Sequence, residues 1–241
     1  MISDRLKRAL DYPYPAPKPP WIFSDHRVFT PGDPLFQKVF QDIGSQARHA
    51  VVAAGSNRAP DQLRRKFEPQ DIVPVSMVTL RDVDTVYSAH FSAYGSVPAT
   101  LTEAVGLSLR SAVLWLTDEQ LERMNETEAL GVNYRLGWID RPALSRRFGL
   151  KSPRTGAYIS LHGALTDDDG SAVPLAGFTV RGRKRQGLTQ QEVQKLVSAR
   201  LHPGSAMEDF IGMTIDNTDE RNRRRDTLKK TAILPDDTFW P

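Results

Sequence analysis

The sequence contains no cysteine. Disulfide frameworks, thiolate metal sites and cysteine nucleophiles are therefore excluded, and the absence is consistent with a reducing compartment. The sequence also lacks an apolar run long enough to cross a membrane, and no apolar stretch of the secretory type follows the charged residues 1–5. We therefore expect a cytoplasmic protein without a membrane partner.

A strong charge of either sign is also missing, because 32 Lys and Arg residues oppose 29 Asp and Glu residues and leave a formal charge of +3. Arginine clusters occur at 181–185 and 221–225, and such clusters can bind nucleic-acid phosphates. Neither cluster carries interleaved aromatic residues or a helix-turn-helix pattern, so mixed-charge solvated faces are the simpler interpretation. Nucleic-acid binding stays an alternative that we do not favour.

The sequence shows no metal-ligand spacing, no P-loop and no Gly-x-Ser-x-Gly elbow. The five histidines are scattered along the chain: His26, His49, His90, His162 and His202. We therefore expect no metal and no cofactor.

Length and patterning predict an α+β fold in three segments that pack as one domain. These are an N-terminal proline-rich arm with a helix over 1–50, a core over 51–185 and a C-terminal helical extension over 186–241. Helices are expected at 3–10, 31–49, 60–67, 118–128, 190–202 and 206–230, the last three after capping boxes at Thr117, Thr189 and Ser205. Strands are expected at 51–54, 72–80, 85–93, 97–101, 111–116 and 132–139, with a hairpin formed by 156–165 and 173–181.

One candidate binding element is the turn that follows the apolar strand 51–54. Gly55, Ser56 and Asn57 end this strand, and Pro60 opens the next helix. Such a turn exposes backbone amides and directs the positive end of the helix dipole toward its ligand, so it can seat a carboxylate or a phosphate. A plain turn before a helix is the competing interpretation.

A candidate catalytic acid lies at the end of the helix 118–128. Leu121, Met124 and Glu128 are spaced by three and four residues, so they share one stripe that faces the core. Burial favours the neutral form of a carboxyl group, which suits a group that exchanges protons near neutral pH. The alternative is that Glu128 is solvated at a frayed helix end, as Glu126 on the opposite face should be.

The order of these elements resembles the γ-glutamylcyclotransferase family over roughly 51–138. The motifs that carry the resemblance are Gly55-Ser56-Asn57 with Pro60 and Leu63, then Ala99-Thr100-Leu101, Val113-Leu114-Trp115-Leu116, Leu121 to Glu128, and Tyr134. The resemblance implies a small mixed β-barrel flanked by helices, here with N- and C-terminal helical extensions.

The resemblance also implies a reaction that needs no cofactor, since the nucleophile belongs to the substrate. Amides of Gly55, Ser56 and Asn57 would hold the α-carboxylate of a small γ-glutamyl substrate. Glu128 would take a proton from the substrate's α-amine, which attacks the γ-carbonyl carbon, and would then protonate the leaving amine. Tyr134 would neighbour that acid, and the product would be 5-oxoproline.

The sequence departs from the family pattern at Ala54, where the family has tyrosine. One substrate contact is then either missing or supplied elsewhere, and Tyr94 is the candidate. Asn125 also replaces an aspartate and Ala129 a glycine. A non-catalytic binding module that keeps the barrel is therefore the alternative function, and the oligomeric state is left open.

Overall fold

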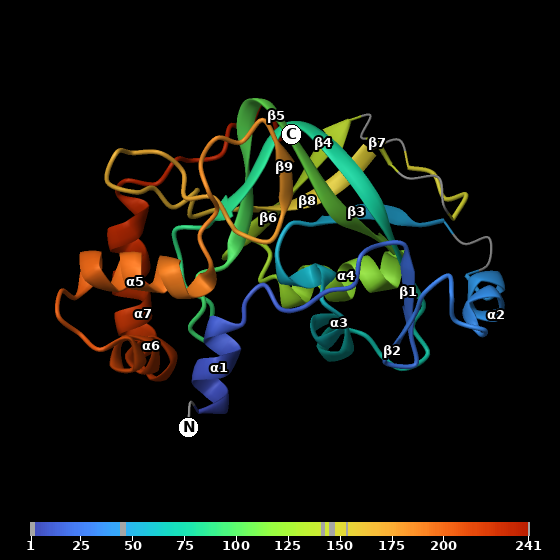
Figure 1. The fold of residues 1–241 in the computed structure, drawn as a ribbon, viewed down its shortest axis with the longest axis horizontal. Coiled ribbons are helices and arrows are strands. Elements are labelled where there is room, and N and C mark those ends of the chain that lie inside the picture. Colours follow the sequence, from blue (N-terminus) through green and yellow to red (C-terminus); the bar gives the residue numbers. More distant parts are fainter. Residues whose placement is uncertain (1–2, 44–46, 141–142, 145–147, 153, 241) are drawn as a thin grey trace.

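The computed structural model describes residues 3–43, 47–140, 143–144, 148–152 and 154–240. The strands gather in one sheet, while the C-terminal helices stand together at one end and further helices lie below the strands (Figure 1). The predicted α+β class is confirmed.

The helices are α1 (Asp4–Leu10), α2 (Phe36–Gln41), α3 (Pro60–Lys66), α4 (Asp118–Thr127), α5 (Gln190–Leu201), α6 (Met207–Asp216) and α7 (Thr218–Lys229), with a 3-10 turn, η1, at Ser56–Arg58. The strands are β1 (Trp21–Ser24), β2 (Arg27–Phe29), β3 (His49–Ala53), β4 (Val73–Tyr87), β5 (Ala99–Leu116), β6 (Tyr134–Asp140), β7 (Ala143–Leu144), β8 (Arg154–Ser160) and β9 (Thr179–Arg181).

The sheet is open, so the predicted closed barrel is wrong. The strand path runs β2-β1-β4-β5-β3-β8-β6, with β7 on β4 and β9 on β5, and among the described residues its end strands β2 and β6 do not pair. Strands β3 and β8 are parallel, and the other pairs are antiparallel. The physical reason is the early hairpin β1–β2, which occupies the edge of β4 and lies outside the resemblance.

Two long strands, β4 with 15 residues and β5 with 18, replace the four short strands predicted at 72–80, 85–93, 97–101 and 111–116. The charged residues Arg81 and Asp82 lie at a bulge, where the register with β5 shifts between Arg81 and Val83. Asp82 has a φ of +57°, and its Oδ1 accepts a hydrogen bond from the Gly106 N–H at 2.7 Å. A bulge bends a strand without ending it, so polar residues at this position do not mark a terminus.

The helices around the site follow the sequence closely. α3 has Pro60 at its first position, and Thr117 and Thr189 form the predicted capping boxes of α4 and α5. The predicted cap at Ser205 is wrong, because α6 begins after Ala206 without a side-chain cap. The helix predicted over 206–230 divides at Asn217, whose side chain accepts the Glu220 N–H at 2.9 Å and starts α7.

Two other predictions are wrong in extent. The helix predicted over 31–49 is only α2, with β3 already running at its far end and 44–46 outside the described residues. The segments 156–165 and 173–181 do not form one hairpin, because β8 pairs with β3 and β6 while β9 pairs with β5. The Asp-Gly turn between them is closed by an isolated bridge between Thr166 and Ala172 and by the hydrogen bond from the Val173 N–H to the Leu165 carbonyl at 2.8 Å, without a longer ladder.

The N-terminal helix and the C-terminal helices share one hydrophobic cluster. Leu6 and Ala9 of α1 pack with Val193 and Val197 of α5 and with Phe210 of α6. Figure 1 shows α1 beside this helical group. Helix α1 is thereby held against the C-terminal helices.

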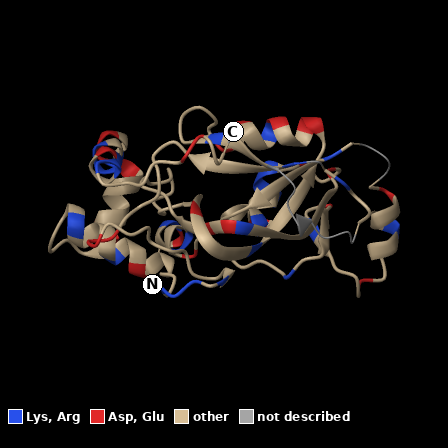
Figure 2. Cartoon of the chain, turned by 90° about the horizontal axis from the view of Figure 1, so that it is seen from above, with Lys and Arg blue, Asp and Glu red and all other residues tan. Residues whose placement is uncertain are grey.

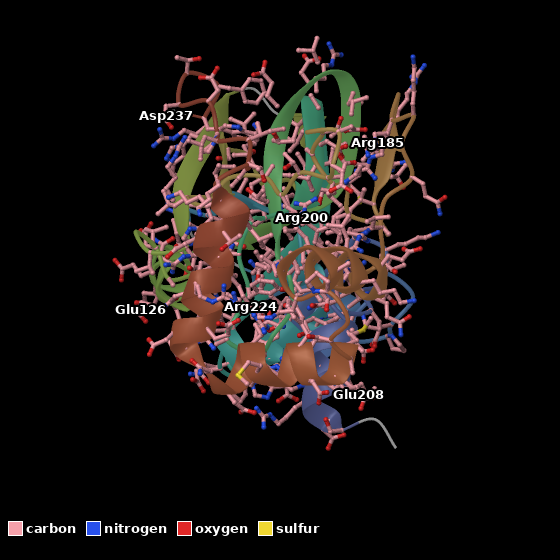
Figure 3. All side chains as sticks on the ribbon, turned by 90° about the vertical axis from the view of Figure 1, so that its left-hand side faces the viewer. Glu126, Arg185, Arg200, Glu208, Arg224 and Asp237 are labelled. Atoms are coloured by element: carbon pink, nitrogen blue, oxygen red, sulfur yellow. The ribbon has the colours of Figure 1, made fainter. Side chains whose placement is uncertain are left out.

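The arginine clusters are largely engaged by acids of the same chain. Arg183 pairs with Asp84, Arg185 with Asp167, and Arg224 with Glu220. Figure 2 shows basic and acidic residues interspersed along the elements, and Figure 3 places Arg224 among the C-terminal helices. Mixed-charge structural contacts therefore account for much of both clusters.

No described helix is both long enough and apolar enough to cross a membrane.

The ion pair between Arg183 and Asp84 should contribute measurably to stability, because both side chains are more than nine-tenths buried. Arg183→Ala leaves the Asp84 carboxylate without its partner, and we expect the free energy of unfolding to fall by about 3–5 kcal/mol. Lys184→Ala, an exposed neighbour, should change it by less than about 0.5 kcal/mol. Urea denaturation of both variants measures the difference, and equal small losses would contradict the prediction.

Candidate active site

A cavity of about 410 Å³ lies where the turn after β3, helix α3, the end of α4 and the start of β6 meet. All the residues predicted for the site line it: Gly55, Ser56, Asn57, Tyr94, Glu128 and Tyr134. Residues from the N-terminal segment, Arg8 and Tyr12, line it as well. The fold therefore brings together groups that lie more than a hundred residues apart in the sequence.

Glu128 faces this cavity rather than bulk water, with 15% of its side chain exposed. Met124, one turn earlier on α4, is fully buried, whereas Glu126 is exposed and stands at the periphery in Figure 3. The spacing along α4 thus distinguished the inward acid from the outward one. Glu128 is the C-cap, and its backbone N–H donates to the Met124 carbonyl at 3.0 Å, which fixes where the side chain leaves the helix.

One oxygen of Glu128 is engaged and the other is available. Oε1 accepts a hydrogen bond from Asn57 Nδ2 at 3.0 Å and forms an ion pair with Lys66. Oε2 accepts no hydrogen bond from any described residue. The carboxylate is thus held in one orientation with a free oxygen, which is the arrangement that a proton acceptor needs.

The turn joins the acid through Asn57 and leaves its own amides unused. Within the described ranges, no protein acceptor takes a hydrogen bond from the backbone N–H of Gly55, Ser56 or Asn57. Strand β3 positions the turn, since Val51, Val52 and Ala53 are buried between β5 and β8.

Two tyrosine hydroxyls bracket the backbone of Ala99 at the cavity wall. Tyr134 Oη donates to the Ala99 carbonyl at 3.0 Å, and the Ala99 N–H donates to Tyr12 Oη at 2.7 Å. Burial raises the pKa of both phenols, so both keep their protons at neutral pH. Tyr12 also lies directly against Gly55, where an added Cβ would overlap its hydroxyl oxygen.

Tyr94 lines the cavity next to the Arg8 guanidinium, which lies 4.5 Å above its ring. The tyrosine hydroxyl nearest to the turn belongs instead to Tyr12, 42 residues before Ala54 in the sequence. Tyr158 Oη, on another wall, donates to Asn125 Oδ1 at 2.7 Å.

Sequence reasoning missed Gln62 and Lys66, which are four residues apart and share one face of α3. Both line the cavity. Gln62 is only 5% exposed, and its buried Nε2 donates to no described group. A buried donor without a partner at a cavity indicates a ligand acceptor, because leaving its hydrogen bond unmade costs about 1–3 kcal/mol. The polar stripe at 62 and 66 beside buried Leu63 was the available signal.

A buried histidine pair lies behind Tyr134. The His90 ring is 5.5 Å from that of Tyr134 and 4.7 Å from that of His162, and His90 Nδ1 is 2.7 Å from Ser88 Oγ. His90 lines the cavity. Burial lowers the pKa of His90 well below its ordinary value and that of His162 to about 4. No group of three or more metal-ligating side chains is found in the part of the chain that the structure describes.

No protein-family model and no curated protein matches the chain. A solved structure described as a γ-glutamyl cyclotransferase is similar at 13% identity and a TM-score of 0.39, over 79% of this chain and 90% of that one. A human protein described as uncharacterised is similar at 14% identity and a TM-score of 0.39, over 80% and 91% of the two chains. An Arabidopsis thaliana protein is similar at 17% identity and a TM-score of 0.37, over 49% and 72%.

At these TM-scores the similarity supports no conclusion about activity.

The histidine pair should make the protein less stable in mild acid. The unfolded chain binds protons at His90 and His162 below about pH 6.5, whereas burial keeps the folded imidazoles neutral, that of His162 down to about pH 4. We expect the free energy of unfolding to fall as the pH is lowered from 6.5 toward 4, with a shallower fall in His162→Gln. Denaturation at several pH values tests this, and NMR titration of His162 near pH 6.5 in the folded protein would contradict it.

Proposed function

We propose that this chain is an enzyme that cyclises the γ-glutamyl group of a small conjugate and releases 5-oxoproline. The observation that carries the proposal is the hydrogen bond from Asn57 Nδ2 to Glu128 Oε1, at 3.0 Å. It joins a turn with unused amides to an acid with a free oxygen at one cavity. These are a seat for a carboxylate and a proton acceptor beside it, as the sequence resemblance implies.

In the proposed reaction the substrate's α-carboxylate binds the amides of Gly55, Ser56 and Asn57. Glu128 Oε2 takes a proton from the α-ammonium group, and the amine nitrogen then attacks the γ-carbonyl carbon. The new carbon–nitrogen bond closes the lactam ring, and the bond from that carbon to the leaving nitrogen breaks. The ring nitrogen's surplus proton passes to the leaving nitrogen, and the proton held by Glu128 completes its protonation, so the carboxylate is regenerated.

Lys66 fits this reaction as the partner that orients Glu128 before the substrate binds. Its side chain is 10% exposed, and its ammonium group pairs with the same oxygen that Asn57 contacts. The enzyme then mainly orients a nucleophile that the substrate already carries.

A second candidate function, binding a γ-glutamyl ligand without turnover, is favoured by the same ion pair. Lys66 competes with the substrate's ammonium group for the Glu128 carboxylate. A protein of this kind would retain γ-glutamyl compounds and release no 5-oxoproline, so one assay separates the two functions.

Replacing the acid should abolish turnover. Glu128→Gln keeps the side-chain shape and the contact with Asn57 but removes the proton acceptor, so we expect release of 5-oxoproline from γ-glutamyl compounds to fall at least about a hundredfold. The readout is chromatographic detection of 5-oxoproline from the purified protein.

The matched control is Glu126→Gln, an exposed glutamate on the same helix. It removes the same charge without touching the cavity and should retain full activity. Equal activity of both variants would exclude Glu128 as the acid/base.

A further inference from the structure

The N-terminal segment 3–20, which comprises α1 and the proline-rich stretch after it, is fixed in place on the domain. Ser3 caps α1 by accepting the Leu6 N–H, and Leu6 and Ala9 are buried against α5 and α6. Arg5 forms an ion pair with Asp216 at the end of α6. Side chains of this segment therefore hold defined positions relative to the cavity.

Tyr12 presents a hydrogen-bond donor to the cavity. The residue is 5% exposed, and its hydroxyl oxygen already accepts the Ala99 N–H at 2.7 Å. The O–H proton has no acceptor among the described residues, although the hydroxyl lies against Gly55 in the turn. A buried hydroxyl normally uses its proton, so a ligand oxygen beside the turn is the missing acceptor.

Arg8 adds a positive charge to the cavity lining. Its guanidinium lies 4.5 Å above the Tyr94 ring, and the edge of a guanidinium stacked in this way can still donate hydrogen bonds. Neither Arg8 nor Arg65, which lines the same cavity, forms an ion pair with a described residue. Because Lys66 already balances Glu128, the two arginines leave the cavity positive. Guanidinium groups bind carboxylates through paired hydrogen bonds.

Several donors at the cavity have no acceptor among the described residues. They are Gln62 Nε2 and the Tyr12 hydroxyl, and the arginines add N–H groups without an ion-pair partner, while the free oxygen of Glu128 can accept. A substrate that complements this cavity carries oxygen atoms along most of its length and one nitrogen donor near Glu128.

We propose that the N-terminal segment completes the substrate site, with Tyr12 donating to a substrate oxygen at the turn and Arg8 binding a carboxylate on the amine half of the substrate. This rests on the proposed function, whose γ-glutamyl half occupies the turn and Glu128. This assigns to Arg8 the discrimination between conjugates with and without a carboxylate on the amine half.

Two probes that differ only in this group test Arg8: γ-L-glutamyl-L-alanine and γ-L-glutamyl-ethylamine, which lacks the second carboxylate. The measured constant is KM where 5-oxoproline is released, and Kd from calorimetry where it is not. Arg8→Ala should raise the constant for the alanine conjugate by about five- to tenfold and leave the constant for the ethylamine conjugate unchanged. Lys7→Ala, an exposed neighbour on α1, should change neither constant.

Tyr12→Phe tests the other contact, because it removes the hydroxyl and keeps the buried ring. We expect the constants for both probes to rise about tenfold, since the γ-glutamyl half is common to them. Tyr87→Phe is the control, because Tyr87 is also a buried tyrosine, its hydroxyl donates to the Leu188 carbonyl at 3.0 Å, and it does not line the cavity. A lowered Tm with unchanged constants in Tyr12→Phe would show a structural contact only and overturn its part in binding.

Failure of the two proposals gives different results. If the protein binds the two probes with different Kd values but releases no 5-oxoproline, the proposed reaction is contradicted and the role of the N-terminal segment in the site is supported. Release of 5-oxoproline with equal effects of Arg8→Ala on both probes overturns the role of Arg8. Binding of neither probe by the unaltered chain overturns the proposed substrate site.

Discussion

The contact between Lys66 and Glu128 fixes the geometry of the cavity, because it ties the last turn of α3 to the end of α4. Removing two charges from water is costly unless each finds a partner and further hydrogen bonds. Asn57 supplies one of these bonds to Glu128, and the Met124 sulfur lies 3.3 Å from Lys66 Nζ. Neither helix can move without leaving a mostly buried charge unpaired, so the turn, α3 and α4 form one unit.

The second constraint is the close approach of Tyr12 to the turn. A Cβ at Gly55 would overlap the Tyr12 hydroxyl and would also come within 3.1 Å of the Ala99 Cβ. The crossing of the N-terminal segment therefore imposes a steric requirement for glycine at this position. The absence of a side chain in the turn leaves room for the hydroxyl of Tyr12, about forty residues earlier in the sequence.

Local patterns were enough to find the acid and the turn, because each depends on neighbours within four residues. Met124 and Glu128 follow helical spacing, and Gly55 follows a buried strand. Lys66, Gln62 and Tyr12 were missed, because their contacts join residues far apart in the sequence. Tyr12 lies in a proline-rich stretch whose composition shows neither its burial nor its target.

The predictions of strand length and sheet closure were wrong for a related reason. The charged residues at Arg81 and Asp82 look like a loop in the sequence, yet the Asp82 side chain accepts a hydrogen bond from Gly106 across the bulge and both strands continue. The sheet then stays open because β1 occupies an edge of β4, and β1 begins at Trp21, directly after the segment that delivers Tyr12. Since Trp21 is fully buried, β1 anchors one end of that segment while α6 and α5 hold the other. The strand that occupies the edge of β4 directly follows the segment that brings the Tyr12 hydroxyl to the cavity, so the open sheet and the added tyrosine both depend on the N-terminal part of the chain.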